Sequence, residues 1–317
     1  MSNAVRHKAE TLIRLLGEGD VFLAAAAEHA LLLPAWRPVH PSIFILGLPR
    51  SGTTLVYQYV VHRLHVAYFP RAVGRYYRAP CLATALQKLR HPPYTSDFHS
   101  CYGNVAGPMA PHEAGRVWGR FFGLHTYVGP GDVSAWQRRI LRRTLGCVQA
   151  LFGGRPFVNK NVKHLLRIPA LRALVPNAIF VRVDRSLSDV AVSLLRARYA
   201  NLKDPTGWWS ARPPNHAALE GRPLPEQIAR QVYGLRAQLD ADGAALPNDA
   251  VVSVDYEAFC AAPERLIERL RNVVPGLVPR SAQVPHFTAS HNPPQTHEET
   301  QLVDFVEALD EAYPRGG

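Results

Sequence analysis

One short segment constrains the fold more than any other, because an apolar run, a glycine-containing loop and a helical stretch follow one another directly. The apolar run is SIFIL at residues 42–46, the loop is GLPRSGTT at residues 47–54, and the helical stretch covers residues 55–61. A strand that leads through such a loop into a helix is typical of an α/β sheet. The backbone N–H groups at the helix start have no intrahelical partners, so the segment predicts a cradle for a phosphate-like anion. An ordinary glycine turn is the plainer alternative.

The loop has the G-x-x-x-x-G spacing of a nucleotide-binding P-loop, but Thr53 stands where that motif has lysine. That lysine normally neutralises the β- and γ-phosphates of a triphosphate, so its absence argues against ATP or GTP. Arg50 is the cation that remains inside the loop. We therefore expect Arg50, Ser51, Gly52, Thr53 and Thr54 to hold an anionic group.

A second anion site is predicted further along the chain. The apolar run at residues 178–183 reads as a buried strand that leads to Arg185. Ser186 is the expected N-cap of the next helix, with Asp189 at the capping-box position. Arg185 and Ser193, two turns into that helix, are placed to bracket one phosphate with a planar fork and a hydroxyl. Taken singly, they would read as a surface arginine and a helix-interior serine.

These two sites resemble the donor site of the sulfotransferases that use 3′-phosphoadenosine 5′-phosphosulfate (PAPS). In that family a P-[RK]-S-G-T-T loop, here residues 49–54, binds the 5′-phosphosulfate, and an Arg with a Ser eight positions later, here Arg185 and Ser193, binds the 3′-phosphate. The family has two more landmarks. One is a strand that ends in lysine, here Lys160. The other is a strand that ends in Tyr-Glu on the adenine side, and here that pair begins at Tyr256. The four landmarks occur in family order.

The resemblance implies one domain over residues 1–317, with a central, mainly parallel sheet of P-loop type and helices on both faces. It implies transfer of a sulfuryl group from PAPS to a hydroxyl or amine of a small-molecule or saccharide acceptor. The product of the donor would be adenosine 3′,5′-bisphosphate (PAP), and no metal is expected. A small-molecule kinase that uses the same loop, or a non-catalytic nucleotide-binding relative, are the alternatives.

Sulfuryl transfer needs cations on the transferred group and on the leaving phosphate, and a base for the acceptor proton. Arg50 and Lys160 are the predicted charge stabilisers, and Lys160 stands at a strand's carboxyl end, where open α/β sheets place ligands. A solvated surface lysine is the plainer reading of Lys160. The histidine of the cytosolic branch is replaced by Val162, and the glutamate of the tyrosylprotein branch by Arg71. Both usual bases are therefore missing from their expected positions.

Three residues are candidates for the base. Glu113, at a helix start that faces the irregular region, is our first choice, and its neighbour His112 is the second. His164 would share a helix face with Lys160 if Asn161 capped a helix there. Each histidine also has a purely structural reading.

Three regions surround the predicted sheet. Residues 1–37 are expected to form a helical cap, with two helices separated by a stop at residues 17–20. Residues 70–135 and 199–225 are irregular and rich in aromatic residues, and they are expected to form substrate-side loops. The basic C-terminal turn of the family is not visible in residues 285–294, where Ser290 or His291 are possible substitutes.

Composition narrows the partners and the compartment. The net charge of +11, from 36 basic and 25 acidic residues, favours anionic ligands, and the dispersed basic residues accompany no nucleic-acid motif. Four widely spaced cysteines match no zinc spacing and indicate free thiols in a reducing compartment. The longest apolar run, residues 21–33, contains Glu28 and is too short to span a bilayer, and no signal peptide opens the chain. We therefore expect a cytoplasmic enzyme without nucleic-acid or membrane partners.

Overall fold

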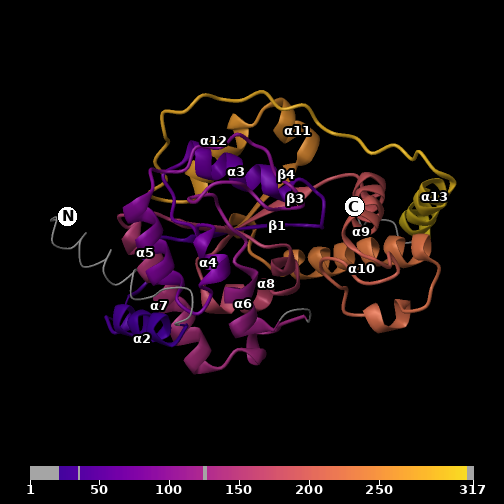
Figure 1. The fold of residues 1–317 in the computed structure, drawn as a ribbon. Coiled ribbons are helices and arrows are strands. Elements are labelled where there is room, and N and C mark those ends of the chain that lie inside the picture. Colours follow the sequence, from indigo (N-terminus) through magenta and orange to yellow (C-terminus); the bar gives the residue numbers. More distant parts are fainter. Residues whose placement is uncertain (1–20, 35, 124–126, 313–317) are drawn as a thin grey trace.

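A computed structural model describes residues 21–34, 36–123 and 127–312. Within these residues, four parallel strands form one sheet in the order β2-β1-β3-β4 (Figure 1). The strands are β1 (Ser42–Gly47), β2 (Phe157–Lys160), β3 (Ile179–Asp184) and β4 (Val251–Asp255). Because all four run in the same direction, their carboxyl ends meet at one edge of the sheet. The predicted α/β class with a parallel sheet is confirmed.

Side chains alternate along each strand, so the sheet packs on both faces. Phe44, Phe157 and Phe180 lie in one buried cluster with apolar residues of α6, α7, α8 and α10. Ile43, Val158 and Val181 lie in another with residues of α3, α11 and α12. Figure 1 shows these two layers on opposite sides of the strands.

The described helices are, in chain order, α2 (Val21–Leu32), α3 (Thr53–Arg63), α4 (Ala72–Arg75), α5 (Pro80–Arg90), α6 (Gly115–Phe122), α7 (Ala135–Leu151), α8 (Ile168–Leu174), α9 (Leu187–Asn201), α10 (Leu224–Ala244), α11 (Tyr256–Ala261), α12 (Glu264–Val273) and α13 (His297–Ala312). Short 3-10 turns occur at η1 (Pro130–Asp132), η2 (Val162–Leu166), η3 (His216–Leu219) and η4 (Asn248–Ala250). None of the described helices is long and apolar enough to cross a membrane.

The predicted N-terminal cap is described only in its second half, because the first predicted helix and the stop at residues 17–20 lie outside the described residues. The second helix is α2, and it packs on α5 and α7 instead of on the sheet. The buried Glu28 carboxylate accepts hydrogen bonds from the backbone N–H groups of Cys81 (3.0 Å) and Leu82 (2.8 Å). Glu28 therefore caps the start of α5, which explains why an acid stands within an apolar run.

The two regions predicted to be irregular differ from that expectation in part. Residues 70–135 contain α4, α5 and α6, which are short helices between proline- and glycine-rich turns. Residues 91–114 contain no helix, and they include Tyr102, Gly103 and Glu113 of the cavity described below. Residues 202–223 form the second long loop, interrupted only by η3.

Residues 274–296, here named the C-terminal strap, connect α12 to α13 without a helix and cross the top of the view in Figure 1. Arg63 on α3 donates from Nη1 to the backbone oxygens of Arg280 (3.0 Å) and Ala282 (2.6 Å). The ring of Phe287 packs against those of Tyr59 (5.8 Å) and Phe259 (5.8 Å). The strap is therefore fastened along its length to α3 and α11.

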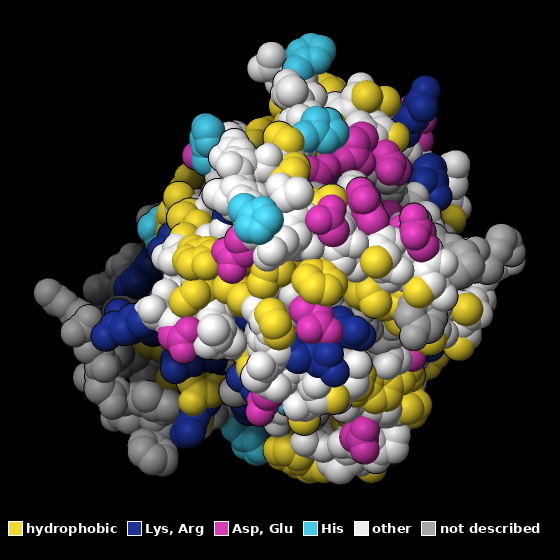
Figure 2. Space-filling model, turned by 90° about the vertical axis from the view of Figure 1, so that its right-hand side faces the viewer, with side chains coloured by type: hydrophobic (Ala, Val, Ile, Leu, Met, Phe, Trp, Pro, Cys, Tyr) yellow, Lys and Arg dark blue, Asp and Glu magenta, His cyan; other side chains and the backbone are white. Residues whose placement is uncertain are grey.

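The strap leads to α13, which packs on α9 and α10 at the end of the molecule that Figure 2 shows. Helix α13 has the sequence HEETQLVDFVEALDEA, with six acidic residues and neither lysine nor arginine. Figure 2 shows acidic side chains gathered on one part of this face and Lys and Arg side chains on another. The positive net charge is therefore distributed unevenly over the surface.

Candidate active site

A cavity of about 390 Å³ lies at the carboxyl edge of the sheet, a volume typical of sites for small molecules. Most of the predicted site residues line it, namely Arg50, Gly52, Thr53, Thr54, Glu113, Lys160, Arg185 and Tyr256. Four predicted site residues do not line it, namely Ser51, His112, His164 and Ser193.

The loop after β1 has the conformation of an anion cradle. Arg50 and Gly52 both adopt left-handed backbone angles, with φ of 70° and 89°. A Cβ on Gly52 would lie 2.4 Å from Cδ2 of Tyr256, so only glycine fits there. The first intrahelical bond of α3 runs from Val56 N–H to the oxygen of Gly52 (3.2 Å), which leaves the preceding amides without helical acceptors. These amides and the Arg50 side chain are available to an anion at the start of α3.

Arg185 joins three parts of the cavity. Its Nη1 donates to the backbone oxygen of Arg50 (3.1 Å), and its Nη2 donates to the backbone oxygen of Ser290 in the strap. Its guanidinium lies 4.5 Å from the ring centroid of Tyr256, the first residue of α11. The Nε of Arg185 is buried and has no hydrogen-bond partner among the described residues. A guanidinium has five N–H groups, so the two bonds of the Nη atoms fix the position of Arg185 and do not use all of its donors.

Two details of this region differ from the sequence prediction. The hydroxyl of Ser193 accepts a hydrogen bond from Nε of Arg50 (3.0 Å), so Ser193 links the two predicted anion sites by holding Arg50. Tyr256 follows the end of β4 and begins α11, so the predicted strand is shorter than expected. The hydroxyls of Ser290 and Tyr256 share a hydrogen bond of 3.2 Å. Ser290 lines the cavity, whereas His291 does not.

An ion pair stands at the other end of the cavity. Nζ of Lys160 donates to the carboxylate of Glu113, and their side chains are 7% and 29% exposed. The end of β2 also holds the backbone of the acid, because Nδ2 of Asn161 donates to the oxygen of Glu113 (3.1 Å) and Nδ2 of Asn159 donates to that of His112 (3.1 Å). Lys160 therefore stands in a polar pocket instead of on a solvated surface, and Glu113 is positioned by its main chain as well as its side chain.

A tight turn covers this pair. Cys101 and Asn104 exchange two backbone hydrogen bonds of 2.9 Å each, and the two residues between them, Tyr102 and Gly103, have φ of 47° and 86°. Two consecutive positive φ values are those of a type I′ turn. A Cβ on Gly103 would lie 3.0 Å from Oε1 of Glu113. The turn therefore brings its backbone directly over the ion pair, and only glycine permits that approach.

Backbone strain is concentrated here. Of the five described non-glycine residues with left-handed φ, three line the cavity, namely Arg50, Tyr102 and Ser210. Such conformations cost free energy and gather at functional sites. Tyr102 contacts both Arg50, whose guanidinium carbon is 5.2 Å from the ring centroid, and Trp209, whose ring is 6.0 Å away. The turn at residues 101–104 had a sequence signal in its Tyr-Gly pair, but nothing local indicated which part of the molecule it would cover.

The two histidine candidates stand outside the cavity. His164 is fully buried, with Nε2 3.0 Å from Oδ1 of Asn159, and the ring of Trp118 is 4.6 Å away. Burial, with the charges of Arg167 and Lys160 adding to it, sets the pKa of His164 well below its ordinary value. Asn161 does cap the 3-10 turn η2, accepting from Lys163 N–H at 2.9 Å, but that turn directs His164 into the core. His164 therefore does not reach an acceptor in this cavity.

His112 has a positioning role. Its Nδ1 accepts from the backbone N–H of Ala114 (2.9 Å), and its ring fills the space beside Gly74, where a Cβ would lie 2.6 Å from Cε1. Burial lowers the pKa of His112, which favours the neutral ring that this acceptor role requires. His112 thus fixes the backbone next to Glu113.

The hydroxyl of Ser51 has no partner and is buried beneath Gly47, where a Cβ would lie 2.6 Å from it. Its side chain packs the loop onto β1 and does not reach the cavity. Of the loop's predicted contacts, those at Arg50, Gly52, Thr53 and Thr54 are the ones that face the cavity.

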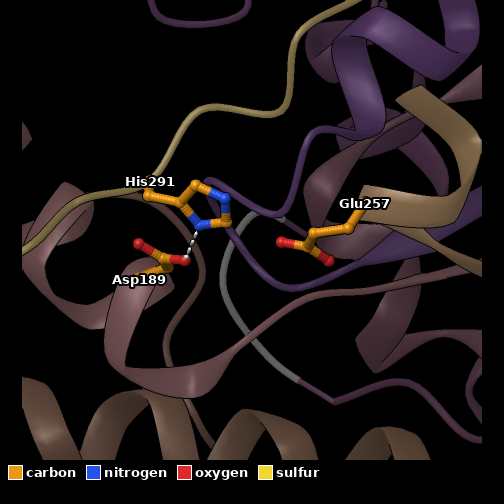
Figure 3. Close-up of side chains that lie close together, drawn as sticks. All are labelled: Asp189, Glu257 and His291. Carbon is orange, nitrogen blue, oxygen red and sulfur yellow. Dashed lines mark hydrogen bonds and ion pairs between the residues drawn. The ribbon is translucent and has the colours of Figure 1, made fainter. Parts of the chain in front are cut away.

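Asp189, Glu257 and His291 form a group of two carboxylates and an imidazole (Figure 3). It lies beside the cavity, since Tyr256 and Ser290, the chain neighbours of the last two, line the cavity. Ser186 caps α9 as expected, accepting from Asp189 N–H at 3.4 Å, but the Asp189 carboxylate is not engaged in a capping box. It accepts instead from the backbone N–H of Asn292 and lies 3.3 Å from Nδ1 of His291. We therefore assign Asp189 to the anchoring of the strap.

The charges in the cavity favour an anion. Three cations, Arg50, Lys160 and Arg185, face it together with a single acid, Glu113. Burial lowers the pKa of Arg50, and the charge of Arg185 acts in the same direction. A negatively charged ligand between these cations would offset both effects, because an opposite charge favours the charged form of each cation. The cavity is thus suited to a ligand with more than one anionic group.

Comparison with known proteins agrees with this geometry. A model described as the sulfotransferase family matches residues 41–274, so the chain belongs to the sulfotransferase family. No curated protein matches the chain.

The fold is similar to that of a solved bacterial sulfotransferase. The sulfotransferase STF1 from Mycobacterium tuberculosis H37Rv is 17% identical, with 92% of this chain and 83% of that chain covered and a TM-score of 0.50. The sulfotransferase STF9 from Mycobacterium avium is 15% identical, with 93% of this chain and 74% of that chain covered and a TM-score of 0.47. The sulfotransferase domain from the curacin biosynthetic pathway is 12% identical, with 74% of this chain and 73% of that chain covered and a TM-score of 0.42.

Proposed function

We propose that this sulfotransferase transfers the sulfuryl group of PAPS to a hydroxyl or amine of a small-molecule or saccharide acceptor and releases PAP. The observation that carries the proposal is the Lys160–Glu113 pair, which shares one cavity with the cationic loop at Arg50. Such a cavity offers charge stabilisation and a proton acceptor in the same enclosed space.

The residues present fit the donor. The amides at the start of α3 and the side chain of Arg50 are suited to the 5′-phosphosulfate, and Gly52 leaves the space that a side chain would fill. Arg185, which lines the cavity and contacts Ser290, is suited to the 3′-phosphate. Ser193 supports both groups by holding Arg50 at 3.0 Å. The ring of Tyr256 forms the wall on the proposed adenine side.

When bound, PAPS supplies the sulfuryl group, and the side chains of this protein do the rest. Arg50, Lys160 and the α3 amides stabilise negative charge on the sulfuryl oxygens and on the leaving phosphate. Glu113 accepts the proton of the acceptor hydroxyl at its carboxylate as the acceptor oxygen bonds to sulfur and the bond from sulfur to the 5′-phosphate oxygen of the leaving PAP breaks. Lys160 orients that carboxylate, and the hydrogen bond from Asn161 holds its main chain. Positioning of this kind contributes most of the acceleration in related phosphoryl transfers.

The acceptor side has aromatic walls. Tyr102 and Trp209, with ring centroids 6.0 Å apart, line the cavity together with Val162. Trp208 instead packs on Arg198 (5.3 Å) and His216 (5.8 Å), so only one of the two neighbouring tryptophans serves the cavity. We propose that the acceptor presents a planar or ring-shaped part to Tyr102 and Trp209.

Incubation of the protein with ³⁵S-labelled PAPS and a mixed library of phenols, alcohols, amines and saccharides tests the proposal. We expect label to appear in at least one acceptor, and we expect Lys160→Met to abolish that transfer. Donor binding without transfer to any acceptor class would favour the non-catalytic alternative. Phosphorylation of an acceptor from ATP would favour the kinase.

A further inference from the structure

A second cavity, of about 350 Å³, lies at the amino edge of the sheet and shares no lining residue with the first. It includes Arg155, two residues before β2, whereas Lys160 at the end of β2 lines the candidate active site. Five residues of extended chain separate these positions, which corresponds to roughly 16 Å at ~3.3 Å per residue. This second cavity, here named the amino-edge cavity, is therefore separate from the proposed donor and acceptor sites.

One side of the amino-edge cavity is apolar and firmly built. Its floor includes the extended segment at residues 64–68, where Ala67 donates to the oxygen of Pro156 (2.9 Å) and accepts from the N–H of Val158 (2.8 Å). The rings of Tyr68 and Phe152 form an aromatic wall, with centroids 5.0 Å apart. Because this wall is attached to the edge of the sheet, its shape does not depend on a bound ligand.

The other side is cationic. Five basic residues line the amino-edge cavity, namely Lys88, Arg155, Arg280, His65 and His91. Among the residues that the structure describes, none of those lining it is acidic. The side chain of Arg155 makes no hydrogen bond or ion pair with any residue that the structure describes. Burial, with the charges of Arg280 and Arg155, lowers the pKa of His65. These like charges repel one another, so a bound anion would relieve an unfavourable arrangement.

Two of the cations are held in place. Lys88 lies 4.1 Å from the ring centroid of Phe152 and donates to the backbone oxygen of Leu151. Nη1 of Arg280 donates to the backbone oxygens of Val61 (3.0 Å) and Tyr94 (3.1 Å). Burial lowers the pKa of Lys88, as expected for an ammonium group without an acidic partner. Lys88 is thus a fixed cation beside a fixed aromatic wall, and this part of the site is preorganised.

We propose that the amino-edge cavity binds a small organic anion, with an aryl body against Tyr68 and Phe152 and one carboxylate or sulfate group between Lys88 and Arg155. An inorganic anion would leave the aromatic wall in contact with water, and a neutral aryl compound would leave the cations unpaired. The ligand therefore needs both parts. This site does not depend on the proposed sulfuryl transfer.

Titration calorimetry of the full chain with 2-naphthoate, and with neutral 2-naphthamide as its control, tests this site. We expect 2-naphthoate to bind and 2-naphthamide to bind at least about tenfold more weakly, in line with charge-assisted hydrogen bonds. Lys88→Met and Arg155→Met should each weaken 2-naphthoate about tenfold, while the thermal unfolding midpoint shows that both variants fold. Arg155 makes no hydrogen bond with the described residues, so its variant remains informative if Lys88→Met unfolds.

Two matched variants locate the binding. Arg142→Met removes an exposed arginine of α7, and Arg185→Ala removes a cation of the first cavity, and we expect both to bind 2-naphthoate like the wild type. No binding of 2-naphthoate, equal binding of 2-naphthamide, or a loss in Arg142→Met equal to that in Arg155→Met would overturn the proposal. Loss of binding in Arg185→Ala would overturn it too, because the anion would then occupy the first cavity.

Discussion

On the proposed donor side of the candidate site the side chains follow directly from strand ends, whereas on the proposed acceptor side the walls come from long loops. Arg50 and Arg185 stand within a few residues of the carboxyl ends of β1 and β3. Tyr102 and Trp209 belong to loops that reach the cavity from distant parts of the chain. Lys160 and Glu113 stand where the two sides meet, with the lysine from a strand and the acid from a loop.

The difference shows where each part of the site gets its precision. The donor side is fixed by strand register and by hydrogen bonds such as that from Arg185 to the oxygen of Arg50 (3.1 Å). On the proposed acceptor side, the shape of the loops depends on residues with left-handed backbone angles, with φ of 47° at Tyr102 and 70° at Ser210. Loops of this kind tolerate sequence change more readily than strand ends, so acceptor preference can change while the donor site is kept.

The largest effect is expected where the two sides meet. Glu113→Gln keeps the shape of the side chain but removes its basicity, so turnover should fall by about 10²–10⁴-fold, the range for a positioned general base. Affinity for PAP should stay within error, since Glu113 belongs to the acceptor half of the reaction. Steady-state turnover together with PAP titration checks this. His164→Ala is the comparison variant, and if it lowered turnover with intact stability while Glu113→Gln did not, the base would be misassigned.

On the donor side, Arg185→Ala should weaken PAP by about 10- to 100-fold, because it removes a fork of charge-assisted hydrogen bonds. Arg185→Lys keeps the charge without the fork, and we expect it to recover only part of the affinity. Calorimetry with PAP and with adenosine 5′-phosphosulfate separates the two phosphate positions. A loss of equal size for both nucleotides would show that Arg185 does not contact the 3′-phosphate.

On the acceptor side, Tyr102→Ala should raise the KM of a ring-containing acceptor about 5- to 10-fold, through the loss of an aromatic contact, and leave PAP affinity nearly unchanged. Tyr102→Phe is the matched control, since it keeps the ring. Initial-rate measurements against each substrate in turn distinguish the two effects. If PAP affinity fell while the acceptor KM stayed constant, Tyr102 would belong to the donor side through its contact with Arg50.

The smallest effect is expected at Ser193, whose hydroxyl reaches the donor through Arg50 at 3.0 Å. Ser193→Ala removes one hydrogen bond and should weaken PAP by about 2- to 10-fold. In Ser193→Ala combined with Arg50→Ala, the additional loss from Ser193 should disappear, because its partner is already gone. A double-mutant cycle with additive losses would contradict this indirect role.

The sequence predicted the proposed donor side better than the part of the site that loops complete. The strand–loop–helix at residues 42–61 and the Arg185 to Ser193 spacing are local patterns, and most of the site residues that they predicted line the cavity. The approach of Glu113 to Lys160 depends on Asn159 and Asn161 binding a segment 47 or 48 residues away, which no local pattern encodes.

The two histidines show the limits of reading single residues. His164 is four positions from Lys160, but the turn η2 directs it into the core, beside Trp118 and Phe44. His112 is next to Glu113, but its ring bonds to the main chain at Ala114. Proximity in sequence therefore did not decide which side chain reached the cavity. The aromatic packing around His164 and the backbone hydrogen bond to His112 decided it.

Titration calorimetry with PAP, set against ATP in the presence of magnesium, tests the proposed donor most directly. The cavity offers three cations and helix-start amides to an anion, but no lysine at Thr53 for a triphosphate. We expect PAP to bind and ATP with magnesium to bind at least about 100-fold more weakly, a difference of ~2.8 kcal/mol. Tight binding of ATP with magnesium, and none of PAP, would contradict the assignment of this cavity to a sulfuryl donor.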